Sequence, residues 1–209
     1  MSCKRLGVII LLASFISAGC SFFDAKPDPS RFFSLTSLPR TGQTAQDATV
    51  TNQLILGIGP IKLPGYLDRQ QMVTRISQNR FAVAENDRWA EPLDENFSRV
   101  LSQNLSILLQ TDRIVAYPWL RSQQPTYQVQ VEVLRFERNE EQTVELWARW
   151  TILDDARKTI GRKESYLTKP VGDKSTEASV AALSEAVADL SRDIANAIRN
   201  VEDGKRPSG

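Results

Sequence analysis

The sequence contains no histidine and only two cysteines, Cys3 and Cys20. Without histidine there is no Ser-His-Asp triad and no Cys-His pair, the common arrangements for nucleophilic catalysis. A zinc site would have to rely on carboxylates, which is uncommon. The formal charge is +1, from 26 basic and 25 acidic side chains, so the chain lacks the basic excess that binds nucleic acid. We therefore expect no cofactor, no metal and no nucleic-acid partner.

Residues 1–19 have the layout of a secretory signal peptide that is cleaved. Lys4 and Arg5 precede a mostly apolar stretch at 6–16, and small residues follow. The apolar stretch has 11 residues, too few for a transmembrane helix, which needs roughly 20. The segment 16–20, Ile-Ser-Ala-Gly-Cys, resembles the lipobox of bacterial lipoproteins, although Ser17 stands where leucine is usual.

This resemblance implies lipid attachment at Cys20, where acyl chains such as palmitate give lasting anchoring without a spanning helix. Ser21 follows the cysteine, where an aspartate would favour retention in the inner membrane, so we expect an outer-membrane location facing the periplasm. The alternative is a secreted protein with a chance cysteine, but no second mature cysteine exists to pair with it. Loss of Lys4 and Arg5 leaves 24 basic against 25 acidic side chains, so charge does not explain attachment.

The mature chain predicts a tether followed by one domain. Residues 20–30 contain two prolines and no hydrophobic period, which favours a lipidated tether. Residues 31–202 are expected to form a single α+β domain, large enough to be stable without disulfides. Residues 203–209 predict a disordered tail.

Hydrophobic alternation predicts a mainly antiparallel sheet in this domain. Residues 126–137 alternate between apolar and polar side chains, and residues 144–152 do the same. With a weaker strand at 158–167, these segments predict a meander that turns at Asp154-Asp155. Shorter strands are expected at 31–37, 54–61 (ending at Pro60), 72–75, 80–83 and 113–117, with a hairpin turn at 77–79 and a mobile loop at 38–52.

Two apolar stripes with helical spacing predict two amphipathic helices packed on the sheet. The first begins at Pro92 and ends near Gln110, with a stripe formed by Leu93, Phe97, Val100, Leu101, Leu105 and Leu108. The second runs from about Ser175 to Val201, with a stripe formed by Val180, Leu183, Val187, Leu190, Ile194, Ile198 and Val201. We expect this helix to pack across the sheet; the alternative is a coiled-coil or oligomer seam of about three heptads.

Patterns that carry catalysis are scarce. Residues 57–60, Gly-Ile-Gly-Pro, lack the third glycine of a dinucleotide fingerprint and open no helix, so we expect a strand along which another backbone passes closely. Asp154 and Asp155 are expected to be solvated in their turn rather than to hold a cation. A catalytic pair of carboxylates like that of a glycosidase stays an open alternative, because the distance between two carboxylates in the fold cannot be read from the sequence.

Two long segments, 59–75 and 87–105, carry a distinctive pattern. It consists of Gly-Pro-aliphatic, Pro-x-Tyr-Leu-Asp-Arg, Val-Thr-Arg and Arg-Trp-Ala-Glu-Pro-Leu. With the lipobox, this pattern resembles the PqiC/YmbA family, lipoproteins that are auxiliary subunits of ABC-type or MCE-type transport systems. The matching residues are Gly59, Pro60, Pro64, Tyr66, Leu67, Asp68, Arg69, Val73, Thr74, Arg75, Arg88, Trp89, Ala90, Glu91, Pro92 and Leu93. Residues 117–119 also fit, whereas Phe32 and Phe33 stand where the family often has tyrosines.

The resemblance implies a non-enzymatic role in a lipid transport system that maintains envelope integrity. The implied partner is a PqiB-like MCE-domain protein anchored in the inner membrane, or the components of an ABC transporter. The chain could form a homo-oligomeric ring, but the sequence does not give the number of subunits. It also does not identify the cargo or the direction of transport. One alternative is a lipoprotein that assembles or plugs an outer-membrane β-barrel. Another is a carboxylate-based hydrolase of peptidoglycan, against which the absence of histidine and of an activated nucleophile counts.

Seven motif residues are candidates for a partner interface: Tyr66, Leu67, Arg69, Arg75, Arg88, Trp89 and Glu91. Tyrosine, arginine and tryptophan are the residue types enriched at binding hot spots. The alternative is structural: Arg69 or Arg75 pairs internally with Asp68 or Glu91, and Trp89 packs over the sheet.

Overall fold

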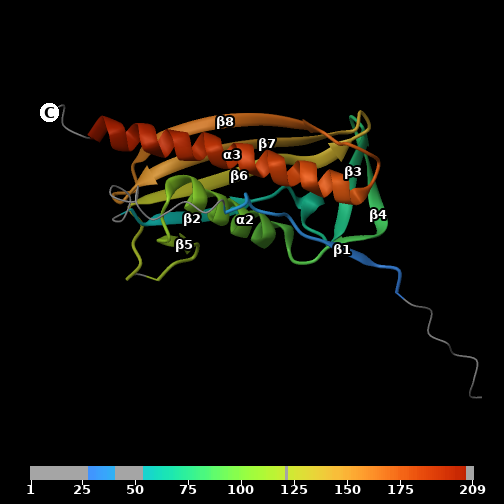
Figure 1. Cartoon of the computed structure of the whole chain (residues 1–209), viewed down its shortest axis with the longest axis horizontal. Coiled ribbons are helices and arrows are strands. Elements are labelled where there is room, and N and C mark those ends of the chain that lie inside the picture. Colours follow the sequence, from blue (N-terminus) through green and yellow to red (C-terminus); the bar gives the residue numbers. More distant parts are fainter. Residues whose placement is uncertain (1–27, 41–53, 121, 206–209) are drawn as a thin grey trace, which may run out of the picture.

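The computed structural model describes residues 28–40, 54–120 and 122–205 (Figure 1). The expected signal peptide, the lipid-bearing Cys20 and residues 20–27 of the tether lie outside the described residues. So do residues 41–52 of the expected loop and 206–209 of the expected tail. Within the described ranges, no helix is long and apolar enough to cross a membrane.

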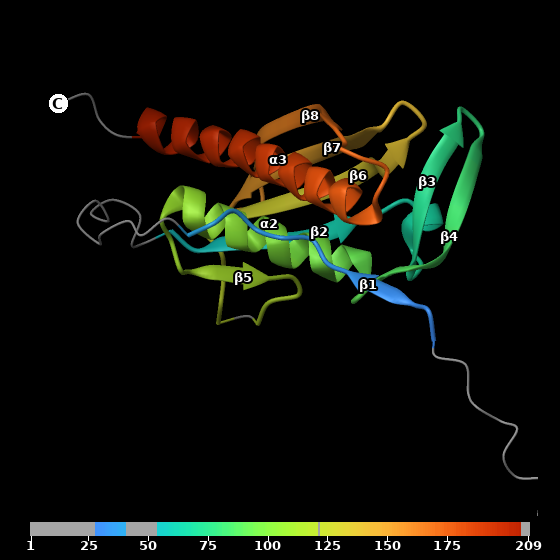
Figure 2. The same cartoon turned by 45° about the vertical axis from the view of Figure 1, so that its right-hand side comes forward.

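Eight strands form one mixed sheet, and both helices cover the same face of it (Figures 1 and 2). The elements are β1 (Arg31–Phe33), β2 (Leu56–Lys62), the 3-10 helix η1 (Gly65–Leu67), β3 (Gln71–Ser77), β4 (Arg80–Trp89), α2 (Leu93–Leu109), β5 (Ile114–Ala116), β6 (Tyr127–Asn139), β7 (Thr143–Asp154), β8 (Thr159–Pro170) and α3 (Thr176–Lys205). The predicted α+β class with two packed amphipathic helices is confirmed, and the sheet is mixed rather than purely antiparallel.

Strand β6 lies at the centre of the sheet. Along one edge it pairs antiparallel with β7, which pairs antiparallel with β8, so the predicted meander is confirmed. Along the other edge it pairs parallel with β2, over residues 127–132, and with β3 only at Arg138 and Asn139. The β3–β4 hairpin is antiparallel, as predicted. At the two ends of this part of the sheet, β1 pairs parallel with β4 and β5 pairs parallel with β2. These parallel partners are distant in sequence, and local alternation carries no information about them.

Strand β2 does not end at Pro60, so that prediction is wrong. The strand continues to Lys62, and its register with β6 is irregular between Ile58 and Ile61. Proline has no N–H to donate to the ladder, and a bulge is one of the few places in a sheet that accepts it.

The expected strand at 31–37 ends at Phe33, because the following segment bonds to the helices instead. The N–H of Leu35 donates to Asn96 Oδ1 of α2 at 3.2 Å, and the N–H of Leu38 donates to Asn104 Oδ1 at 2.7 Å. Both asparagines are fully buried. We call residues 34–38 the N-terminal strap; the backbone N–H groups of Leu35, Thr36 and Leu38 bond to side chains of the helices and need no strand partner.

The helices follow their predicted stripes. Helix α2 ends at Leu109, and Gln110 takes the left-handed conformation that often closes a helix. Helix α3 lies over β7 and β8 and packs against α2 (Figure 2). It continues to Lys205, so residues 203–205 are helical where the sequence predicted a disordered tail. A hydrogen bond from Tyr127 Oη to Glu202 holds this last part of the helix on the sheet.

Candidate interaction site

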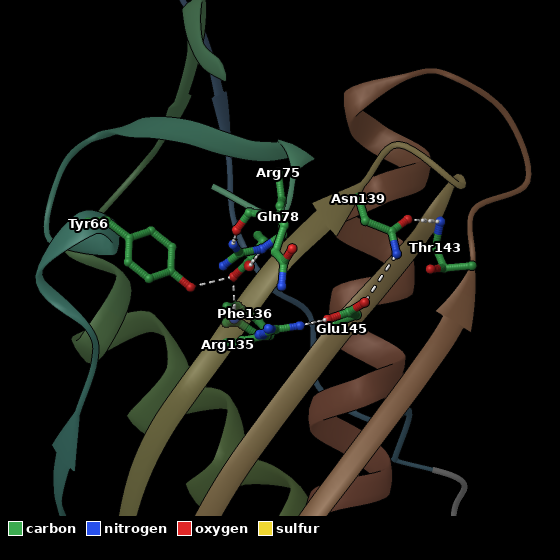
Figure 3. Close-up of polar contacts among 9 residues, drawn as sticks. Tyr66, Arg75, Gln78, Arg135, Phe136, Asn139, Thr143 and Glu145 are labelled. Atoms are coloured by element: carbon green, nitrogen blue, oxygen red, sulfur yellow. Dashed lines mark hydrogen bonds and ion pairs between the residues drawn. The ribbon is translucent and has the colours of Figure 1, made fainter. Parts of the chain in front are cut away.

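Several motif residues gather where β6 lacks a strand partner. Between Glu132, the last residue paired with β2, and Arg138, the first paired with β3, this edge of β6 has no strand beside it among the described residues. A register shift between Val133 and Arg135 separates the alternating residues from the end of the strand. The gap is bridged by η1 and β3, on the sheet face away from the helices (Figure 3).

The buried carboxylate of Glu137 is the centre of this cluster. Its side chain is only 1% exposed. It accepts hydrogen bonds from Tyr66 Oη at 2.6 Å and from the N–H of Phe136 at 2.9 Å, both on Oε2, and from Arg75 Nε at 2.7 Å on Oε1 (Figure 3). A buried charge is tolerated when it is both paired and hydrogen-bonded, and Glu137 meets both conditions.

Aromatic contacts hold the donors of this cluster in place. The ring of Phe81 stacks on Tyr66 at a centroid distance of 4.6 Å, and the guanidinium of Arg75 lies 4.4 Å from the centre of the Phe81 ring. Burial raises the pKa of Tyr66, and the hydrogen bond to the Glu137 carboxylate raises it further. Tyr66 is therefore a neutral hydrogen-bond donor at physiological pH.

A second polar network lies beside the first on the same sheet face. Glu145 accepts from Arg135 Nη1 at 2.9 Å and from Asn139 Nδ2 at 3.2 Å, and Asn139 Oδ1 accepts the N–H of Thr143 (Figure 3). Burial opposes ionisation of Glu145, but these hydrogen bonds outweigh it and lower its pKa. The network links β6 to the turn that leads into β7.

This second network continues into an aromatic pair that the sequence analysis did not single out. The Arg135 guanidinium lies 5.7 Å from the centre of the Trp147 ring, which meets Tyr166 edge-on at 6.4 Å. Tyr166 is 58% exposed. The sequence does indicate that Trp147 is unusual. This tryptophan falls on the polar side of the alternating strand, between Glu145 and Arg149.

The seven candidate residues occupy different environments. Leu67 and Trp89 are buried in the hydrophobic core, and Tyr66 and Arg75 hold Glu137. Glu91 pairs with Arg99, and Arg88 is half-buried. Arg69 is exposed, and its side chain has no hydrogen-bond or ion-pair partner in the described part of the chain.

The structural alternative is confirmed for Trp89 and corrected for Arg75. Trp89 is 4% exposed and packs in the core. Arg75 pairs internally, but with Glu137 rather than with Asp68 or Glu91, so the predicted partners were wrong. The true partner lies on a strand distant in sequence, which no local pattern indicates. Whether these residues also contact a partner protein stays a prediction.

A further buried carboxylate joins three elements at the start of the domain. Asp87 of β4 accepts from Arg31 Nε at 2.7 Å and Nη2 at 2.9 Å, and Thr176 at the start of α3 donates to it as well. Asp87 is 8% exposed. This contact fixes the point at which the chain enters the domain, and sequence reasoning missed it.

Among the described residues, the acidic side chains form no cluster that could serve as a metal site. Across 28–40, 54–120 and 122–205, no three cysteine or acidic side chains are grouped so that they could hold a metal ion. Asp154, the last residue of β7, accepts the N–H of Lys158, and Asp155 in the following turn accepts the N–H of Ala156, so the chain turns where the sequence predicts.

Comparison with known proteins identifies relatives of the chain and of the fold. The family model described as "ABC-type transport auxiliary lipoprotein component" matches residues 34–195. The intermembrane transport lipoprotein PqiC of Escherichia coli (strain K12) is 27% identical over 123 residues, which cover 59% of this chain and 62% of PqiC. The same protein from Shigella flexneri gives the same values. The match thus spans less than two thirds of the length of these curated relatives.

Two crystal structures share the fold. One, of an uncharacterized protein, superposes with a TM-score of 0.66 at 20% identity. The superposition covers 81% of this chain and 98% of the other. The other, of a protein from Xanthomonas campestris, gives a TM-score of 0.67 at 12% identity, with coverages of 85% and 100%. At these identities the similarity establishes the architecture alone.

Proposed function

Because this chain belongs to the family of ABC-type transport auxiliary lipoprotein components, we propose that it is the lipid-anchored docking subunit of an MCE-type or ABC-type lipid transport system that maintains envelope integrity. The observation that carries the proposal is the family match over residues 34–195, which contains both motif segments. The similarity to PqiC, an intermembrane transport lipoprotein, supports a transport role.

In this proposal the anchor is the lipidated Cys20, and the membrane is the outer one, as Ser21 suggests. The domain faces the periplasm, where it meets a PqiB-like MCE-domain protein or transporter components held in the inner membrane. The chain's task is position and contact, and it needs no catalytic group for that task.

The motif residues divide between support and contact. Leu67 and Trp89 support the core, while Tyr66 and Arg75 fix η1 and β3 around Glu137. The turn between η1 and β3 is thereby held firmly and presents Arg69 to solvent. Rigid presentation lowers the entropic cost of binding, so we assign direct partner contact to Arg69.

Co-purification of the full lipidated chain from membranes tests the proposal. The parent chain is expected to recover an MCE-domain protein or ABC transporter components, and Arg69→Ala to lose most of that recovery. The matched control is Arg80→Ala, an exposed arginine at the start of β4 outside the family motif, which should retain the partner. Recovery of an outer-membrane β-barrel protein instead would overturn the docking role in favour of barrel assembly.

A further inference from the structure

Three of the five large hydrophobic side chains that are exposed in the described part of the chain belong to β1 and to the loop that follows β5. Phe32 of β1 is 61% exposed, and Tyr117 and Leu120 of the loop are 51% and 69% exposed. The other two, Val83 of β4 and Tyr166 of β8, lie on other strands. In both views, β1 and this loop lie along the same lower edge of the molecule (Figures 1 and 2). The turn of the β3–β4 hairpin points to the opposite edge.

The loop after β5 is built to hold this shape. The Trp119 ring packs on Gly57 of β2 so closely that a Cβ there would lie 2.9 Å from Trp119 Cζ3. Gly59, at φ +115°, leaves room in the same way for the Cβ of Tyr117, whose N–H donates to Ile58 O at 2.8 Å. A close approach to this strand was expected from another backbone, whereas the atoms that approach Gly57 and Gly59 most closely belong to side chains. The outward exposure of Tyr117 and Leu120 therefore belongs to a loop fixed on β2.

We propose that this edge, defined by Phe32, Tyr117 and Leu120, rests in the headgroup region of the membrane that carries the lipid anchor. The inference rests on the proposed lipidation of Cys20. Seven residues, 21–27, lie between Cys20 and Asp28, where the described domain begins, and the eight steps along the chain span at most about 28 Å. β1 therefore stays within that distance of the membrane surface, and this limit favours its edge as the one that faces the bilayer.

The chemistry of the edge suits a bilayer interface. Tyrosine and tryptophan are enriched at the level of the lipid headgroups, because their rings are apolar and their polar groups stay hydrated. Exposed apolar side chains add to the hold of a lipid anchor in proportion to the apolar area they bury. With β1 and the loop both in contact, the domain lies at a fixed angle, and the hairpin turn points away from the membrane.

Depth-dependent quenching of a fluorophore tests this orientation. Once Cys20 is lipidated the mature chain has no other cysteine, so a single introduced cysteine can be labelled in the full lipidated protein. The test position is Leu120→Cys, and the controls are Gln78→Cys in the hairpin turn and Thr168→Cys on β8, both at exposed sites. The proteins are reconstituted in vesicles of phosphatidylethanolamine and phosphatidylglycerol, with a nitroxide lipid as quencher.

We expect quenching at position 120 to be several-fold stronger than at positions 78 and 168. Equal quenching at all three positions would show a domain that swings freely on its tether and would overturn the inference. Flotation of the same vesicles separates this failure from failure of the anchor. Chains that float without selective quenching contradict only the orientation, whereas chains that do not float contradict the lipid anchor and the orientation together.

Discussion

At the scale of single residues, two residues of the family motif bind a carboxylate that lies outside it. Tyr66 and Arg75 both donate hydrogen bonds to the buried carboxylate of Glu137. The resemblance pointed to the two donors from sequence alone. It did not point to their acceptor, because the end of β6 follows a register shift that alternation does not reveal.

Replacing Glu137 tests this explanation. Glu137→Gln removes the charge that compensates Arg75 while keeping the size of the side chain. Breaking a buried ion pair in this way is expected to lower the free energy of unfolding by about 3 kcal/mol, measured by urea denaturation. Glu132→Gln, at an exposed site on the same strand, is the control and should change it by less than about 0.5 kcal/mol. Equal stability of the two variants would mean that the cluster is not structural.

The neighbouring Glu145 predicts a pH dependence of stability. Its hydrogen bonds from Arg135 and Asn139 outweigh its burial and lower its pKa below the usual value of a glutamate side chain. A carboxyl whose pKa is lowered by folding stabilises the protein above its unfolded pKa, and that contribution is lost as the pH falls through the folded pKa.

In Glu145→Gln, the unfolding free energy should therefore fall less between about pH 6 and about pH 3 than it does in the parent. Chemical denaturation at a series of pH values measures this difference. Glu140→Gln, at an exposed residue in the adjacent turn, should follow the parent curve. Coincident curves for Glu145→Gln and the parent would contradict the assigned hydrogen bonds.

At the scale of elements, local signals predicted what depends on neighbours in sequence. The stripe from Leu93 to Leu108, with Pro92 before it, predicted α2 closely, and alternation predicted β6 and β7. Local signals could not predict the parallel strands that pair with β6, because those strands are distant in sequence. They could not predict the N-terminal strap either, although Asn104 is a polar residue within an apolar stripe, and its buried side chain needs a hydrogen-bond partner.

The strap predicts a local effect of substituting Asn104. This side chain accepts from the N–H of Leu38 and donates from Nδ2 to Ser191 Oγ at 3.2 Å. Asn104→Ala leaves the Leu38 N–H without its acceptor, so hydrogen exchange of residues 34–38 should accelerate, with a loss of about 2 kcal/mol in unfolding free energy. Gln103→Ala, at the exposed neighbouring position, should leave exchange in the strap unchanged. Unchanged exchange in both variants would mean that other contacts hold the strap.

At the scale of the whole molecule, the surfaces of the fold differ in the side chains that they carry. One sheet face is covered by α2 and α3 (Figure 1), and the other carries the Glu137 cluster (Figure 3). The Trp147–Tyr166 pair continues from the neighbouring Glu145 network through Arg135. The edge formed by β1 and the loop after β5 carries the exposed apolar side chains that we assign to the membrane. The missing histidines and the near-neutral charge fit such a division, since the proposed function depends on placement and contact.

Photocrosslinking in the native envelope tests the central claim most directly. A photoreactive residue is placed at Arg69 of the full lipidated chain, and at Thr168 as the matched control on β8, another exposed site. The account predicts an adduct between position 69 and an MCE-domain protein or an ABC transporter component, and no such adduct at position 168. An adduct with a β-barrel protein, or the absence of any adduct at position 69, would contradict the docking role.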